Sequence, residues 1–116
     1  MDSNPHLLSQ TAEALITDPS NQLHLSVVSL WEIAIKTKLG KLILRVPIST
    51  MVGENERTNG LEVLPVSPSH VYELEQLPLV HNDPFDRMLV SVANCEQATL
   101  VSADAVLQQY PVSLQW

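Results

Sequence analysis

The spacing of apolar residues alternates along the chain between a helical and an extended pattern. Apolar residues three or four positions apart predict helices over residues 8–17, 30–39, 48–58, 68–77, 84–96 and 103–109. Short apolar or β-branched runs between them predict strands over residues 23–28, 61–66, 98–102 and 112–114. Because helices that connect successive strands favour parallel pairing, the sequence predicts an α/β fold with a mainly parallel sheet of about four short strands. No linker or repeat interrupts residues 1–116, so we expect a single domain.

Residues that start or stop helices support these boundaries. Gly40 follows the second helix as a C′ residue, and Asn59-Gly60 follows the third. Ser67-Pro68 and Asp83-Pro84 each place a capping residue before a proline at the first helical position. The residues of the second helix that we expect to face inward are Leu30, Ile33, Ala34 and Trp31.

The charge balance excludes a protein that binds nucleic acid through a basic surface. The 116 residues include 13 acidic and 6 basic side chains, for a formal net charge of −7, and 45% of them are apolar, enough for a folded core. A nucleic-acid partner would therefore need a bound cation to neutralise its phosphates. Four bases lie close together, which indicates a solvated helix face or a contact with an RNA backbone: Lys36, Lys38, Lys41 and Arg45.

The sequence has no features of a membrane or secreted protein. No apolar run approaches the roughly 20 residues of a membrane span, and residues 1–5 resemble no signal peptide. The single cysteine, Cys95, excludes an internal disulfide and a cysteine-based zinc cluster, and we expect it to be packed within its helix. We therefore expect a soluble, cytoplasmic protein without a membrane partner.

Three acidic residues fall where a parallel sheet binds its ligands. Glu32 lies early in the helix after the first strand, Asp86 lies in the first turn of the helix over residues 84–96, and Asp104 directly follows the third strand. Because ligands bind outside the carboxyl ends of parallel strands, these carboxylates could converge on one edge of the sheet. Carboxylates without cysteine or dense histidine suit Mg²⁺ or Mn²⁺, and such an ion can activate a water against a phosphodiester.

Each acidic residue also has a purely structural interpretation. Ser29 and Glu32 fit a capping box, in which Glu32 satisfies only a backbone N–H. Asp83 and Asp86 fit the acidic first turn that the helix dipole favours, and Asp104 fits the N-cap of a short helix. Residue type and spacing leave both interpretations open at each position.

Three segments resemble the acidic motifs of PIN-domain proteins of the VapC toxin type. Residues 26–36, Ser-Val-Val-Ser-Leu-Trp-Glu-Ile-Ala-Ile-Lys, followed by Leu-Gly-Lys-Leu, are similar to the second motif of that family. Residues 77–87, Leu-Pro-Leu-Val-His-Asn-Asp-Pro-Phe-Asp-Arg, resemble the third motif, and residues 99–104, Thr-Leu-Val-Ser-Ala-Asp, resemble the fourth. The ending Tyr-Pro-Val-Ser-Leu-Gln-Trp fits the last strand of the family, so the resemblance covers nearly all of the chain.

The resemblance implies a PIN-like three-layer α/β/α fold and a metal-dependent endoribonuclease, usually the toxin of a VapBC-type toxin–antitoxin pair. Glu32, Asp86 and Asp104 match acidic residues of the family, which implies that they hold Mg²⁺ or Mn²⁺ and act in catalysis. The implied partners are an RNA substrate, a cognate antitoxin and a second copy in a homodimer. The candidates for contacts with the substrate are Ser102, Arg87 and His81, of which the histidine could instead orient a carboxylate.

The chain departs from the family at its N-terminus. PIN domains open with a central strand that ends in an Asp, typically within Asp-Thr-His, and residues 2–8 resemble the segment after that strand. Asp2 is no convincing substitute, because a residue at a frayed terminus has no place on a central strand. We expect an N-terminally truncated domain whose native start lies upstream of Met1, rather than a degraded relative or a sheet completed by another chain.

The absence of that first carboxylate affects the expected function. With one of four acidic residues unmatched, the ribonuclease activity of these 116 residues is expected to be weak or absent. The alternative is a non-catalytic PIN-like binding module, which would pair with an antitoxin or a paralogous toxin through its apolar surface.

Overall fold

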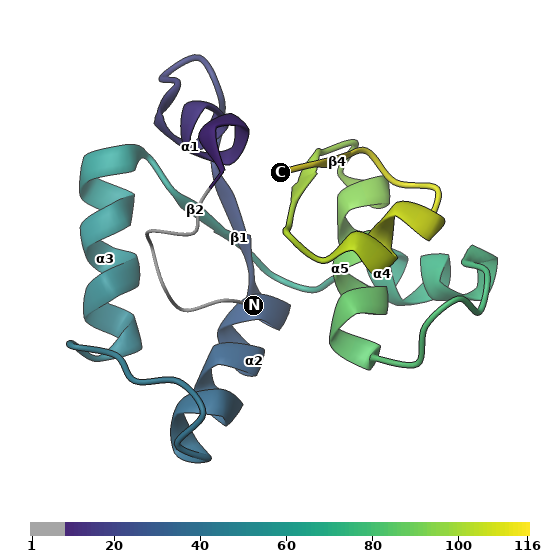
Figure 1. The fold of residues 1–116 in the computed structure, drawn as a ribbon, viewed down its shortest axis with the longest axis horizontal. Helices are drawn as coiled ribbons and strands as arrows, with labels where there is room; N and C mark the ends of the chain where they lie inside the picture. The colour runs from purple at the N-terminus through teal and green to yellow at the C-terminus, as the bar shows by residue number, and fades with distance from the viewer. Residues whose placement is uncertain (1–8) are drawn as a thin grey trace. The chain divides into compact units, whose positions relative to one another are not determined.

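The computed structural model describes residues 9–116, which form two compact units over residues 9–65 and 66–116 (Figure 1). Each unit contains helices and one two-stranded parallel sheet. The predicted α/β class and the parallel pairing are therefore confirmed. The four strands differ from the expected single central sheet, because in the described part of the chain β1 pairs with β2 and β3 pairs with β4. The proposed truncation concerns residues before Ser9, which lie outside the described range.

The unit of residues 9–65 is a pair of parallel strands connected by helices. Helix α1 spans Gln10–Thr17, and the side chain of Ser9 accepts a hydrogen bond from the N–H of Ala12 at its start. Strand β1 (His24–Ser26) runs directly into α2 (Val27–Lys38), and α3 (Ile48–Asn59) leads into β2 (Glu62–Leu64), as Figure 1 shows. The register pairs His24 with Glu62 and Ser26 with Leu64. Two connecting helices are therefore what allows β2 to return parallel to β1.

Helix α2 begins three residues earlier than the capping-box interpretation requires. The hydroxyl of Ser26 accepts a hydrogen bond from the N–H of Val28 at 3.1 Å, so Ser26 is the N-cap, and Ser29 already lies inside the helix. The capping box of Ser29 with Glu32 is therefore wrong. Glu32 lies in the second turn, where it satisfies no orphan N–H of the helix start.

The buried face of α2 also differs from the predicted one. Val28 and Ile33 are its buried residues, whereas Ala34 is exposed and Trp31 is 60% exposed. The helix ends as predicted, because Gly40 adopts a φ of +74° and its N–H donates to the carbonyl of Thr37. A left-handed residue at this position satisfies carbonyls of the last turn, and glycine adopts it without a Cβ penalty.

The unit of residues 66–116 packs helices against a second parallel pair. Helix α4 (Pro68–Glu73) begins at Pro68 behind the N-cap Ser67, as predicted, and it continues into the 3₁₀ turn η2 (Leu74–Gln76). Helix α5 spans Pro84–Cys95 behind the predicted cap Asp83, and Cys95 is exposed at its end rather than packed within it. Strand β3 (Leu100–Val101), the 3₁₀ helix η3 (Ala105–Gln109) and β4 (Leu114–Gln115) complete the unit.

The core of this unit fixes α5 in place. A buried cluster of Leu77, Val90, Leu107 and Tyr110 joins the segment before α5, the helix itself and the segment after η3. Ser91 is fully buried, and its hydroxyl donates to the carbonyl of His70 in α4. The imidazole of His70 accepts from the N–H of Ser67 at Nδ1, so its proton lies on Nε2, which donates to the carboxylate of Glu96 at 2.9 Å. Apolar packing around Val90 and the buried hydrogen bond from Ser91 to His70 together hold α5 in its place in this unit.

None of the helices in residues 9–116 combines the length and the apolar character that crossing a membrane requires.

Candidate metal centre at the start of helix α5

The start of α5 carries two aspartates with different structural roles. Asp83 caps the helix, since its Oδ1 accepts hydrogen bonds from the N–H of Phe85 at 2.9 Å and of Asp86 at 3.3 Å. Asp86 stands in the turn itself, and its side chain is 17% exposed. The structural interpretation of Asp83 as a helix cap is therefore confirmed, while Asp86 caps nothing. The two carboxylates lie in the field of the helix N-terminus, which favours negative charge.

His81 completes a group of three metal-ligating side chains. Its Nε2 lies 3.0 Å from Oδ2 of Asp86. One donor atom from each of His81, Asp83 and Asp86 lies within 4.8 Å of the other two, and all three side chains are half-buried. The group forms the only cluster of three such residues within residues 9–116. It presents two carboxylates and one imidazole toward a common point.

Without a bound cation, the negative charge of the Asp86 carboxylate is unfavourable in this group. Burial raises the pKa of the Asp86 carboxyl, and the negative charges of Asp83 and Asp104 raise it further, against the opposing effect of His81. Arg87 is the sole lysine or arginine between Val66 and Trp116. Its guanidinium donates to a backbone carbonyl and to a tyrosine hydroxyl rather than to the Asp86 carboxylate. A divalent cation would neutralise repulsion that the protein leaves in place.

Asp104 lies after β3, as the sequence predicts, and also caps η3. Its Oδ1 accepts from the N–H of Val106 at 3.1 Å, and its own N–H donates to the hydroxyl of Ser102 at 3.2 Å. Ser102 thus stabilises the turn that carries the acid. Asp104 stands outside the three-residue group, but its charge acts on Asp86.

Glu32 belongs to the unit of residues 9–65. Its carboxylate forms an ion pair with the ammonium group of Lys36 at 3.4 Å, one helical turn later, and its side chain is 22% exposed. The carboxylate is therefore already paired with a cation and only partly accessible. Of the predicted acidic residues, the structure brings Asp86 and Asp104 into electrostatic contact, within the other unit.

Arg87 and Tyr110 support the segment that precedes α5. The guanidinium of Arg87 donates from one nitrogen to the carbonyl of Pro78 at 2.9 Å and to the hydroxyl of Tyr110 at 3.4 Å. That hydroxyl donates to the carbonyl of His81 at 3.2 Å. Residue patterns gave no signal for Tyr110, which is 29 residues from His81 in the sequence. Asp83 was expected to act as a helix acid only, and its carboxylate was missed as a possible metal ligand.

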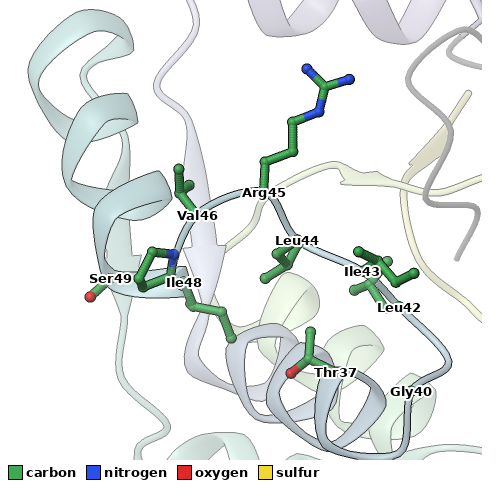
Figure 2. A pocket seen from close by; sticks show the side chains of 10 residues that line it. Thr37, Gly40, Leu42, Ile43, Leu44, Arg45, Val46, Ile48 and Ser49 are labelled. Atoms are coloured by element: carbon green, nitrogen blue, oxygen red, sulfur yellow. The ribbon is translucent and has the colours of Figure 1, made fainter.

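A hollow in the other unit has a different chemical character. It lies between the end of α2 and the start of α3 and is open and mainly apolar (Figure 2). Of the ten residues that line it, Arg45 alone is ionisable, and its side chain extends away from α2 in Figure 2. The hollow therefore offers no acid–base pair and no carboxylate group for catalysis.

A comparison with known protein families shows to which family the chain belongs. The family model of the PIN domain matches residues 4–112. The chain belongs to the PIN domain family. PIN domains are a nuclease-like superfamily whose members typically depend on divalent metals and bind RNA, often with antitoxin partners. No curated protein and no solved structure matches the chain at a significant level.

Membership of the PIN family gives the group at α5 a chemical interpretation. Carboxylate oxygens are the donors that Mg²⁺ and Mn²⁺ prefer, and two of the three side chains supply them. The uncompensated repulsion at Asp86 is what a bound cation relieves. The residues present thus fit the divalent ion on which PIN domains typically depend.

Proposed function

We propose that this chain is a metal-dependent endoribonuclease, the toxin component of a VapBC-type toxin–antitoxin system that acts on RNA in the cytoplasm. The observation that carries the proposal is the group of His81, Asp83 and Asp86 at the start of α5, within a chain of the PIN family. Hard oxygen donors in a half-buried, negatively charged position favour Mg²⁺ or Mn²⁺ over softer metals. A bound cation would also let a protein with a net charge of −7 approach phosphate.

The proposed roles divide between holding the cation and contacting the substrate. Asp86, Asp104 and Glu32 are the proposed metal-holding and catalytic carboxylates, and Asp83 adds a neighbouring oxygen. When bound, the ion would activate a water and stabilise the charge that develops on the phosphodiester. His81 orients Asp86 through its 3.0 Å contact. The residues that we propose at the substrate side are Ser102, Arg87 and His81.

Cleavage of RNA by the purified protein tests this proposal. A labelled single-stranded RNA is incubated with the protein in Mg²⁺, in Mn²⁺ and in EDTA. We expect slow cleavage that needs the metal, slow because no residue of the chain matches the first Asp of the family motif. Glu32→Gln, Asp86→Asn and Asp104→Asn should each lower the rate at least tenfold.

The matched controls are exposed acidic residues that do not belong to the group. Glu13→Gln and Asp18→Asn change the charge of the exposed residues Glu13 and Asp18 and should leave the rate within about twofold. Cleavage that persists in EDTA, or that survives Asp86→Asn unchanged, would show that the assigned site is wrong.

A second candidate function is a non-catalytic module that binds an antitoxin, a paralogous toxin or a second copy of the chain. It is favoured by exposed apolar side chains that follow one another along α2 and beyond it: Trp31 at 60%, Ile35 at 37%, Leu39 at 62% and Ile43 at 88%. Thermal melts with added Mg²⁺ or Mn²⁺ distinguish the two functions. A rise in Tm indicates the metal site by linkage, and a flat response favours the binding module.

A further inference from the structure

The loop in front of α5 is fixed to the core by a short chain of hydrogen bonds. Arg87 donates to the carbonyl of Pro78 at 2.9 Å, which closes the loop from the helix side. Tyr110 donates to the carbonyl of His81 at 3.2 Å and accepts from Arg87 at 3.4 Å. Tyr110 is 4% exposed and belongs to the core cluster with Val90 of α5. The backbone of His81 is therefore tied to a side chain that is itself buried.

This attachment decides where the imidazole of His81 lies. The histidine precedes α5 and belongs to no helix or strand, so regular backbone hydrogen bonds do not fix it. With its carbonyl held by Tyr110, its Nε2 comes within 3.0 Å of Oδ2 of Asp86. Without that anchor the loop has rotational freedom, and both the imidazole and the carboxylate that it orients lose their fixed direction.

The bonding of Arg87 also explains why the group stays negative. Arg87 directly follows Asp86 in the sequence and carries the one Lys or Arg charge of residues 66–116. Its hydrogen bonds go to a backbone carbonyl and a phenol rather than to a carboxylate. The Arg87 guanidinium, which would otherwise compete with a metal ion for the Asp86 carboxylate, is thus held in a structural contact.

We propose that Arg87 and Tyr110 are positioning residues of the metal centre, which act through His81 on the carboxylate of Asp86, a role that rests on the proposed metal-dependent function. Outer contacts that orient metal ligands typically contribute 10–100-fold in metal affinity. Arg87 thereby acts on the group through its contacts with Pro78 and Tyr110, in addition to the contact with RNA proposed for it.

Mn²⁺ affinity and the NMR signal of His81 test the proposal together. Tyr110→Phe removes the hydroxyl and keeps the buried ring, and Arg87→Met removes the guanidinium and keeps the stem. We expect each variant to weaken Mn²⁺ binding about tenfold by calorimetric titration. In the metal-free protein, the ¹⁵N signals of the His81 imidazole should move toward those of a solvent-exposed histidine. The double variant should lose no more affinity than either single variant, because both residues act through one path.

The matched control is Tyr72→Phe, which removes a hydroxyl from a tyrosine that is 69% exposed. It should leave both the Mn²⁺ affinity and the His81 signal unchanged. Wild-type affinity and an unchanged His81 signal in Tyr110→Phe and Arg87→Met would overturn the positioning role. If Tyr110→Phe does not fold, Arg87→Met and its His81 signal decide the matter. Absence of Mn²⁺ binding by the wild-type protein would instead refute the proposed function, and the metal-free NMR signal would still report whether Tyr110 holds His81.

Discussion

Replacing Asp86 by asparagine should stabilise the metal-free protein, although it removes a residue of the proposed centre. The Asp86 carboxylate is half-buried and lies near the negative charges of Asp83 and Asp104, so its ionised form costs free energy in the folded state. Asparagine keeps the size and one oxygen for the contact with His81, and it removes the charge. Partly solvated charge pairs contribute about 0.2–1 kcal/mol each, so after screening by solvent we expect a gain of about 0.5–1 kcal/mol, or roughly 2–6 °C in Tm.

The pH dependence of that gain has a defined sign. The raised pKa means that folded Asp86 binds its proton more tightly than the unfolded chain does. Stability is therefore lost as pH rises from the ordinary value of 3.8 through the higher folded-state pKa. Asp86→Asn has no such loss, so its advantage in Tm should vanish below about pH 3.8 and be complete at pH 7.

Added metal should reverse the order of the Tm values of the wild type and Asp86→Asn. Thermal melts followed by circular dichroism in EDTA and in Mn²⁺ measure this directly. A ligand at 100 times its Kd stabilises the folded state by about 2.7 kcal/mol, so the wild type should gain Tm in Mn²⁺ and Asp86→Asn should gain little.

Asp18→Asn serves as the control for charge alone. Asp18 accepts from the N–H and the hydroxyl of Ser20 at 2.9 and 2.7 Å, and these bonds lower its pKa. Its replacement should not raise Tm, and it should leave the metal response intact. A lower Tm for Asp86→Asn than for the wild type in EDTA at pH 7 would refute the electrostatic reasoning.

Three further predictions concern the stability and the reactivity of residues outside the candidate metal centre. Ser91→Ala removes a fully buried hydroxyl and leaves the carbonyl of His70 without its donor, so urea denaturation should show a loss of about 1–3 kcal/mol. Gly40→Ala meets no atom within 4 Å at its Cβ but must adopt a φ of +74°, so the same assay should show a loss of about 1–2 kcal/mol, and no loss would contradict the C′ assignment. Partial desolvation and the charges of Glu73 and Glu96 raise the pKa of the exposed Cys95 thiol. Iodoacetamide should therefore react with it more slowly than with glutathione at pH 7.5, and equal rates would count against this.

Local signals in the sequence predicted most of the helix boundaries. Asp83-Pro84 and Ser67-Pro68 start α5 and α4, and Gly40 and Gly60 follow α2 and α3 with positive φ. These signals depend on residues within one turn of the boundary, which the sequence displays directly. The start of α2 was missed because Ser26 and Ser29 both fit an N-cap, and only the contact of the Ser26 hydroxyl with Val28 distinguishes them.

The candidate site was predictable only in part, because its supporting contacts are distant in sequence. Asp86 and Asp104 follow from their places at a helix start and after a strand. The contact of Tyr110 with His81 spans 29 residues, and that of Arg87 with Tyr110 spans 23, so no periodicity reveals them. Asp83 was missed as a possible metal ligand because a helix cap already explains that residue.

The measurement that tests the central claim most directly is a titration of ¹⁵N-labelled protein with substoichiometric Mn²⁺, observed by NMR. A bound paramagnetic ion broadens the amide signals of the residues around it, wherever they lie in the sequence. A metal site at the start of α5 predicts selective broadening around His81, Asp83 and Asp86, which Mg²⁺ in excess reverses and Asp86→Asn abolishes. Broadening around Glu32 in the same titration would support its proposed role as a ligand, and an unchanged Glu32 signal would remove it from the site. Absence of selective broadening anywhere would contradict the metal-dependent function itself.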